Sequence, residues 1–304
     1  MGETFLQAGV LFTLIALGAL LRATGALKGS DFKVLSTVAL NVTIPAALFW
    51  GTRTLQMTRS SLSIVALGLG LNLFLLGIAH LLSRGKSPLE RAFTAFNLPG
   101  YNVGCFSLPF VQSLLSPAAI ATACLFDSGN AIMCCGVTYA LGSAYLGVKG
   151  RENFFLSFLK RVFSSVPFCV YTFIFFMRGT GLQLPEFFWR VVSLIAPANI
   201  FLAMFLLGVG LNLRLDRSKA KAFASHLFWR TALTLVTVAL GAWLLPFEGE
   251  QKLALLLMML SPATIMGAAF TARVGGDSEL ASTYNSASTL ISLCTMTALV
   301  LFWR

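Results

Sequence analysis

The sequence is poor in charged residues: Asp, Glu, Lys and Arg make up only 11% of its 304 residues. Soluble domains carry about a quarter of such residues, so this composition excludes an ordinary soluble protein. Apolar runs of the length that a helix needs to cross a bilayer recur along the whole chain instead. The short alternating segments of a membrane β-barrel are not seen. We therefore predict an all-α, polytopic membrane protein.

The sequence also lacks the motifs of membrane enzymes and pumps. An intramembrane aspartyl protease needs two carboxyl groups, and only Asp127 lies inside an apolar segment. The chain has no H-E-x-x-H motif, no P-loop and no G-x-S-x-G context with a mid-membrane histidine. We expect neither an enzyme nor an ATP-driven pump, and no cofactor beyond a coupling ion.

Metal-binding and nucleic-acid-binding patterns are missing as well. The 6 cysteines all lie in apolar segments, without metal-ligand spacing to a histidine. We expect them to be buried, inert thiols. His80 and His226 lie near predicted helix ends and are given no chemical role. The net charge of +11 comes from basic residues in short loops, which indicates membrane topology and not a nucleic-acid partner.

Charged and turn residues divide the chain into ten apolar segments. The predicted spans are 4–21, 32–51, 61–82, 92–114, 118–145, 163–178, 187–212, 222–245, 253–274 and 279–303. The first is interpreted as a span and not as a cleaved signal peptide, because it has no basic leader. The stretch 152–162, which is basic and aromatic, is expected to lie along the membrane interface.

The distribution of basic residues predicts the orientation. The loops after odd-numbered spans, together with Arg230 near the start of span 8, hold sixteen Lys and Arg, and the other side holds six. The positive-inside rule then places the odd-numbered loops in the cytoplasm and both termini outside. Arg230 itself is expected to snorkel to the cytoplasmic face.

Three pairs of short motifs indicate an internal repeat. They are Arg22-Ala-Thr-Gly with Arg178-Gly-Thr-Gly, Pro45-Ala-Ala-Leu-Phe with Pro197-Ala-Asn-Ile-Phe, and Pro99-x4-Gly104 with Pro262-x4-Gly267. Each copy contains five spans, and an odd number inverts the second copy in the membrane, as in secondary transporters. We predict a first repeat at 1–147, a short cytoplasmic linker at 148–162 and an inverted second repeat at 163–304.

Proline and glycine residues at matching positions predict two broken helices. A proline in a helix interior costs about 3 kcal/mol or more, so we expect unwound segments from Pro99 to Pro109 and from Pro262 to Gly267. A simple kink is the alternative for either proline alone. The symmetric pair instead favours a transport site, with the breaks crossed near the middle of the bilayer and half-helix N-termini facing an anion.

Polar residues near the breaks are the candidate ligands. Asn102 offers amide donors and an acceptor, and Thr264 is the nearest polar counterpart in the second break. Asn41 and Asn199 are candidates to line a pathway, whereas Asn72 and Asn285 are expected to form interhelical hydrogen bonds. The predicted substrate-binding residues are Asn102, Gly104, Ser107, Pro109, Pro262, Thr264, Gly267, Asn41 and Asn199.

Asp127 lies in the middle of the fifth predicted span. An ionisable residue at this depth is expensive and by default a functional candidate. One interpretation is a proton carrier; another is a Na⁺ ligand, with Ser128 and Asn130 completing the oxygen shell. A permanently protonated or hydrogen-bonded structural carboxyl group is the third.

These motifs together resemble the auxin efflux carrier family. The stretch Asn102 to Pro109 is similar to the N-x-G-x-x-G-x-P of its fourth span, with Ser107 in place of the second glycine. Residues 38–49, 203–213 and 262–277 resemble its second, seventh and ninth spans. The resemblance implies crossed broken helices 4 and 9, an architecture shared with bile-acid carriers and sodium–proton antiporters. It also implies a scaffold of spans 1, 2, 6 and 7 and a moving domain of spans 3–5 and 8–10.

The same resemblance implies an elevator-type transporter of small organic anions, such as auxin, malate or malonate, in a bacterial inner membrane. Ala272-Arg273-Val274 stands where the plant carriers have Lys-Glu-Tyr, and their long cytoplasmic loop is absent, so a bacterial-type permease fits better. A sodium-coupled bile-acid-type carrier and a non-transporting anion sensor remain alternatives. The expected partners are the organic anion, the lipid bilayer and, as a candidate, a second copy of the chain.

Overall fold

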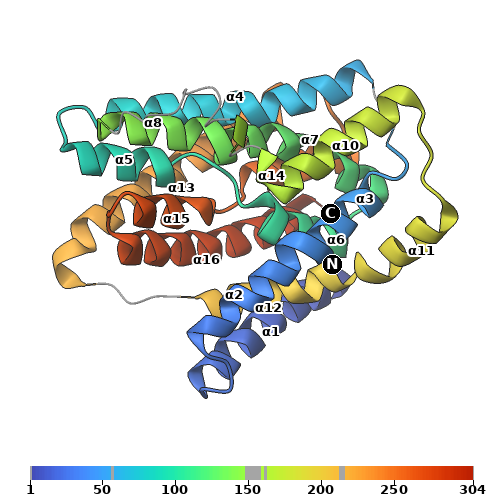
Figure 1. The fold of residues 1–304 in the computed structure, drawn as a ribbon, viewed down its shortest axis with the longest axis horizontal. Coiled ribbons are helices and arrows are strands. Elements are labelled where there is room, and N and C mark those ends of the chain that lie inside the picture. The colour runs from blue at the N-terminus through green and yellow to red at the C-terminus, as the bar shows by residue number, and fades with distance from the viewer. Residues whose placement is uncertain (1, 56–57, 148–158, 161–162, 212–215, 304) are drawn as a thin grey trace.

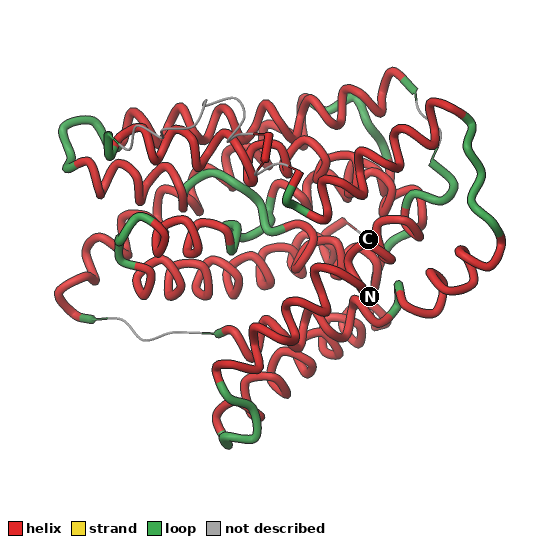
Figure 2. The backbone as a smooth tube through the Cα atoms, in the orientation of Figure 1, coloured by secondary structure: helices red, strands yellow, loops and turns green. Residues whose placement is uncertain are grey.

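The chain folds into helices, as Figures 1 and 2 show for this computed structural model. The structure describes residues 2–55, 58–147, 159–160, 163–211 and 216–303, and all regular secondary structure in these ranges is helical. Most of the predicted linker at 148–162, with its interfacial segment, lies outside the described residues.

Six helical segments of the described ranges are long and apolar enough to cross a membrane. They are Phe5–Ala23, Ser30–Gly51, Arg59–Leu82, Glu186–Gly210, Arg217–Leu244 and Ser278–Trp303. Large apolar side chains on their outer faces are exposed, for example Leu194 and Phe302. An apolar outer surface is what contact with lipid requires, so the helices indicate a membrane-embedded protein.

Four of the helices are uninterrupted over their length. They are α1 (Gly2–Ala23), α4 (Arg59–Leu82), α13 (Ala220–Leu244) and α16 (Ser278–Trp303). A short 3₁₀ helix, η4 (Arg217–Lys219), precedes α13. A fifth helix, α10 (Val166–Thr180), is shorter and begins with Pro167 in its first turn, where the missing N–H of proline leaves no hydrogen bond unmade.

The other segments are built from shorter pieces. The pieces are α2 (Gly29–Val38), η1 (Ala39–Thr43) and α3 (Ile44–Gly51); α5 (Pro88–Asn97), η2 (Val103–Ser107) and α6 (Leu108–Leu114); α7 (Pro117–Ile132), η3 (Met133–Val137) and α8 (Thr138–Tyr145); α11 (Glu186–Ile195) and α12 (Ala198–Gly210); and α14 (Gly249–Met259) and α15 (Met266–Arg273). The elements η1, η2 and η3 are single turns of π-helix.

Two stretches of non-helical backbone interrupt the fourth and ninth apolar segments. The first break is 98–102, between α5 and η2, and the second break is 260–265, between α14 and α15. The first break is shorter than predicted, whereas the second has the predicted length but begins and ends two residues earlier. Pro109 lies in the first turn of α6, where proline is tolerated, and Gly267 lies in the first turn of α15.

The helices form two groups. The α1 group consists of α1, α2, η1, α3, α10, α11 and α12; α1 packs along α12, and α3 packs on α10 and α11. The α4 group consists of α4–α8 with η2 and η3 and of α13–α16; α4 packs along α7, and α5 packs on α8 and α15. In Figure 1, α1, α2 and α12 form the lower edge of the molecule, below the α4 group.

Each group contains one helix pair in very close contact. A Cβ atom added at Gly18 or Gly208, in the α1–α12 pair, would lie 2.2 Å or 1.9 Å from a backbone oxygen of the opposite helix. At Gly68 and Gly129, in the α4–α7 pair, the corresponding distances are 2.2 Å and 2.1 Å. Glycine is therefore required at these crossings, because small residues let two membrane helices approach.

Two arginines donate hydrogen bonds to carbonyls at the C-terminal ends of helices within the α1 group. Arg22 of α1 donates to the carbonyl of Val209 at the end of α12. Arg178 of α10 donates to the carbonyls of Thr52 and Arg53 just after α3. The last carbonyls of a helix have no partner within it, and a basic side chain satisfies them and opposes the negative end of the helix dipole.

Candidate functional site

A cavity of about 410 Å³ lies where the two breaks meet. It is lined by both breaks together with η1, η2, α7, η3, α15 and the start of α10. Its polar side chains belong to Asn41, Tyr101, Asn102, Asp127, Asn130, Ser164, Ser165, Thr264 and Arg273. A polar cavity inside an apolar helix bundle is a candidate binding site.

The two breaks contact each other directly. The backbone N–H of Asn102 donates to the carbonyl of Pro262 at 3.0 Å. Gly100 has a φ of +84°, and a Cβ added there would lie 2.6 Å from Cγ2 of Thr264. Any larger residue at Gly100 would therefore be strained and would push the breaks apart.

Asparagine side chains replace the missing helical partners in the first break. Nδ2 of Asn130 donates to the carbonyl of Tyr101 at 2.9 Å, while its Oδ1 accepts from the N–H of Tyr101 at 3.0 Å. Oδ1 of Asn72 accepts from the N–H of Gly100 at 2.8 Å. Buried backbone groups need such partners, because an unpaired one in the membrane interior costs several kcal/mol.

The second break is supported from α16. Oγ of Ser288 accepts from the N–H of Ala263 at 3.0 Å, and Nδ2 of Asn285 donates to the carbonyl of Ala263 at 2.6 Å. The hydrogen bonds predicted for Asn72 and Asn285 are therefore present, but they hold unwound backbone and not only a neighbouring helix.

One arginine connects the two breaks. Arg230 of α13 is only 2% exposed; its guanidinium donates to the carbonyl of Leu98 at 2.7 Å and to that of Ser261 at 3.0 Å. These carbonyls follow the C-terminal ends of α5 and α14, where both helix dipoles are negative. The expectation that Arg230 snorkels to the membrane surface is therefore wrong, because its side chain is satisfied inside the bundle.

Asn102 differs from the other asparagines at the breaks. It is 4% exposed, lines the cavity, and its Nδ2 atom has no hydrogen-bond partner. The side chain projects from the junction between the first break and η2. A buried amide without a partner costs about 1–3 kcal/mol, and a ligand with an acceptor atom in the cavity would remove that cost.

Asp127 lines the same cavity and is 6% exposed. Its Oδ1 accepts from Nδ2 of Asn130 at 2.8 Å, and its Oδ2 accepts from the hydroxyl of Tyr171 at 2.7 Å. Tyr171 belongs to α10, so this second bond joins the α1 group to the α4 group. The buried carboxyl group is thus held from both sides.

Among the other predicted site residues, Gly104, Asn41 and Thr264 also line the cavity. At Gly104 a Cβ would have its nearest neighbour, Ile44, at 3.7 Å, so the cavity is open beside this glycine. The amide of Asn41 donates to the carbonyl of Thr37 in its own helix. Thr264 accepts from the N–H of Met266.

The remaining predicted residues lie outside the cavity lining. The hydroxyl of Ser107 pairs with that of Ser261, and Asn199 bonds to Thr43 and Gln112. The hydroxyl of Ser128 donates to the carbonyl of Leu125 in its own helix. Pro109 lies in α6, and Gly267 packs against α5. Pro99 lies in the first break, and Pro262 contributes its carbonyl to the contact between the breaks.

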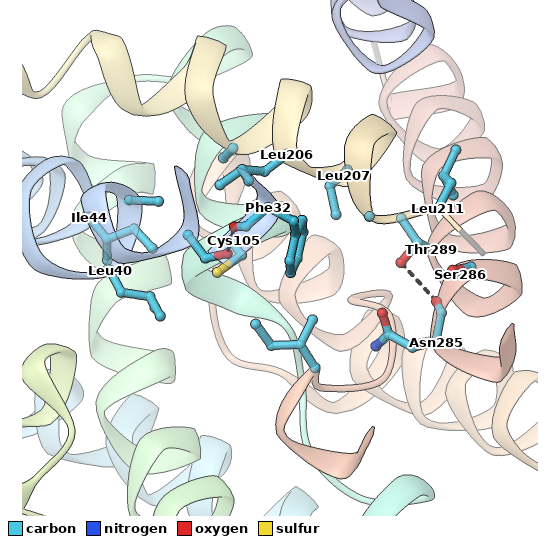
Figure 3. A pocket seen from close by; sticks show the side chains of 15 residues that line it. Phe32, Leu40, Ile44, Cys105, Leu206, Leu207, Leu211, Asn285, Ser286 and Thr289 are labelled. Carbon is cyan, nitrogen blue, oxygen red and sulfur yellow. Dashed lines mark hydrogen bonds between the residues drawn. The ribbon is translucent and has the colours of Figure 1, made fainter. Parts of the chain in front are cut away.

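A second, smaller cavity adjoins the first. It has a volume of about 80 Å³, and Leu40, Ile44, Cys105 and Ile265 line both cavities. Figure 3 shows its mainly apolar wall, including Phe32, Leu206, Leu207 and Leu211. Its polar residues are Ser36 of α2 and Asn285, Ser286 and Thr289 of α16. Figure 3 also shows the Thr289 hydroxyl bonded to the Asn285 carbonyl.

Sequence reasoning missed the roles of three residues. Tyr171 is one of several aromatic residues in an apolar segment, and nothing in its local pattern distinguishes it. Ser288 lies in a helix rich in Ser and Thr. The position of Arg230 could have predicted its role. It lies ten residues inside α13, and an arginine inside a membrane helix needs a partner within the protein.

Long apolar helices around a buried polar cavity place this chain among helical membrane proteins. No model of a known protein family matches the chain, and a comparison with curated proteins finds no match either.

Proposed function

We propose that the protein is a secondary transporter of a small organic anion, of the kind that the auxin efflux carrier family represents. The observation that carries this proposal is the meeting of two helix breaks at a polar cavity with an unpartnered Asn102 amide. Broken helices that meet in a cavity are how secondary transporters expose polar groups to a solute inside the membrane.

An inverted repeat of five plus five spans is part of the proposal. The two matched arginines support it, because Arg22 caps a helix of the second half and Arg178 caps a helix of the first half. Gly25 and Gly181, which follow them by three residues, both have positive φ angles, of 78° and 74°. Pro45 and Pro197 also lie at matching interruptions, after η1 and between α11 and α12.

Donor groups in the cavity favour an anionic substrate. Asn102 presents its free amide, and the exposed Arg273 contributes a positive charge at the cavity edge. The helix α10 also begins at the cavity, so its positive dipole end adds to this potential. Both oxygens of Asp127 already accept hydrogen bonds, which reduces its repulsion of an anion.

The lining of the cavity extends to residues next to the basic loops. Ser164 and Ser165, before α10, and Arg273, at the end of α15, line it. The positive-inside rule assigns these loops to the cytoplasm, so we propose that this conformation is inward-facing. We propose that the α4 group moves against the α1 group to expose the cavity on the other side, with a proton or Na⁺ at Asp127 as the coupling ion.

Counterflow in proteoliposomes tests the function. Vesicles that contain the protein are loaded with unlabelled malate, malonate or auxin and assayed for uptake of the same labelled compound. We expect exchange with at least one carboxylate and a drop of at least tenfold for Asn102→Ala. The matched control Gln183→Ala removes an exposed amide outside the cavity and should leave exchange unchanged.

The outcomes separate a transporter from a sensor. Saturable binding without counterflow would support a sensor and contradict the proposed transport. Unchanged exchange by Asn102→Ala would show that this amide does not contact the substrate.

A further inference from the structure

The contact between the two helix groups contains a buried hydrogen bond at the edge of the cavity. The hydroxyl of Tyr171, on α10, donates to Oδ2 of Asp127, on α7, at 2.7 Å. The two residues are 2% and 6% exposed. A hydrogen bond between two nearly buried groups is stronger than one at a surface, and breaking it costs each group its partner.

Asp127 also bonds to Asn130, the residue that holds the backbone of the first break. The other carboxylate oxygen of Asp127 accepts from Asn130, and the same asparagine amide holds the carbonyl and the N–H of Tyr101. A chain of hydrogen bonds therefore runs from α10, through Asp127 and Asn130, to the unwound backbone at the cavity.

A second polar contact between the groups lacks these properties. Nδ2 of Asn199, on α12, donates to Oε1 of Gln112, on α6, at 3.3 Å. Both side chains are neutral amides, and neither lines the cavity. The Tyr171–Asp127 bond is distinguished because one partner can change its charge and also faces the solute.

We propose that Tyr171 is a latch that holds the α4 group in the inward-facing position. The proposal rests on the proposed function, because it assumes that the two groups move. Tyr171 and Asp127 belong to different groups, so the movement separates them. A cation bound at Oδ2 of Asp127 competes with the Tyr171 hydroxyl, and this competition links ion occupancy to release of the latch.

The surroundings of Asp127 contain few groups that could replace the latch. Within the described part of the chain, the titratable side chains electrostatically coupled to Asp127 are Tyr171 on α10, Cys105 on η2 and Cys124 on α7 itself. A thiol is only a weak hydrogen-bond donor, so neither cysteine matches a tyrosine hydroxyl as a partner for the carboxylate. Loss of the Tyr171 hydroxyl therefore leaves Oδ2 without an equivalent partner.

Cys105 supplies a direct readout of the open state, because it lines both cavities and is only partly buried. Inside-out membrane vesicles carrying the full-length protein are treated with a membrane-impermeant maleimide, and modification of Cys105 is followed by mass spectrometry. We expect Tyr171→Phe to slow this modification at least twofold, because fewer molecules keep the cavity open to the cytoplasmic side.

The matched control is Tyr284→Phe. Tyr284 is 1% exposed and its hydroxyl has no hydrogen-bond partner, so removing that hydroxyl breaks no bond. Cys105 modification should proceed at the wild-type rate in this variant. A rate for Tyr171→Phe equal to that of the control would overturn the latch.

A double variant separates the latch from a general packing effect. If Tyr171 acts through Asp127, then Tyr171→Phe slows modification no further when Asp127→Leu is already present. Additive effects of the two substitutions would contradict the latch. If Tyr171→Phe does not yield folded protein, Asp127→Leu alone tests the same bond and carries the same expected slowing.

The readout needs no substrate, so the two proposals can fail separately. Slowed modification together with absent counterflow in the wild-type protein would retain the latch and remove the transport function. Wild-type modification of Tyr171→Phe together with normal counterflow would retain the function and remove the latch.

Discussion

The two helix breaks occupy matching places in the chain but are built with different chemistry. Asn72 and Asn130, from α4 and α7, hold the backbone of the first break, and a third asparagine, Asn102, keeps its amide free. The second break is held from α16 by Asn285 and Ser288. Its own polar side chains are both engaged: Thr264 accepts from the N–H of Met266 at the start of α15, and Ser261 pairs with Ser107.

This difference teaches that two breaks at matching places in a chain need not have the same role. Both breaks must satisfy unwound backbone away from water. Of the two, only the first contains an asparagine amide nitrogen without a partner among the described residues. Under the proposed function, we therefore expect solute contact mainly at the first break, with the second break as its structural support.

The largest effect on stability is expected from Asn130→Ala. Asn130 makes five side-chain hydrogen bonds, with Tyr101 twice and with Asn72, Asp127 and Cys134. Three of these bonds, to Tyr101 and Asn72, join different segments and contribute about 0.6 kcal/mol each. The substitution also leaves the buried N–H and carbonyl of Tyr101 unpaired, which costs about 1–3 kcal/mol, so we expect a total loss of roughly 3 kcal/mol. Unfolding equilibria in detergent measure it, and Ser128→Ala in the same helix is the control, because Ser128 bonds only within α7.

The next largest effect is expected from Arg230→Met. The substitution removes one donor from each break and leaves the carbonyls of Leu98 and Ser261 without their charged partner. We expect a loss of roughly 2 kcal/mol, given that hydrogen bonds to charged groups contribute about 1.5–3 kcal/mol in water and less in membranes. The same unfolding assay on Arg22→Met, an exposed arginine that also caps a helix end, should show a smaller loss.

Hydrogen exchange of the backbone sharpens this prediction. Since Arg230 contacts both breaks, Arg230→Met should increase exchange in α5 and in α14 together. Faster exchange at only one break would show that the arginine does not link the two halves.

Ser288→Ala should have a modest effect, because it removes a single bond to the N–H of Ala263 while Asn285 still holds the carbonyl. We expect a loss of about 0.6 kcal/mol, the average for such bonds in membrane proteins. The control is Ser282→Ala, because that hydroxyl bonds only within α16. A loss as large as that of Asn130→Ala would mean that the two breaks are supported equally.

The smallest change in stability is expected from Asn102→Ala. Its Nδ2 atom has no partner, so removal of the amide breaks no hydrogen bond of that atom, and the relief of an unpaired buried group opposes the loss of packing. The free energy of unfolding should therefore change by less than about 0.5 kcal/mol. The thermal stabilisation produced by a bound carboxylate should disappear in the same variant, since a ligand raises apparent stability only if it binds. A large loss of stability without ligand would assign Asn102 a structural role.

The sequence predicted the helical membrane class because repeated apolar runs of spanning length are typical of membrane helices and rare in soluble domains. It also indicated both breaks, since proline and glycine act on the backbone next to them. The extent of the first break was overestimated, because Val103–Ser107 forms a π-helical turn whose geometry leaves no mark in residue type. Tyr171 and Arg230 act over 44 and 132 positions along the chain, and local patterns do not encode such contacts.

The crossed arginine caps have a consequence for how the protein is made. The end of α3 enters the membrane early in synthesis, but its cap, Arg178, belongs to a helix translated more than a hundred residues later. Arg22, by contrast, is already in place when α12 emerges. The end of α3 therefore lacks this cap until α10 has been synthesised, whereas the end of α12 meets a cap that already exists.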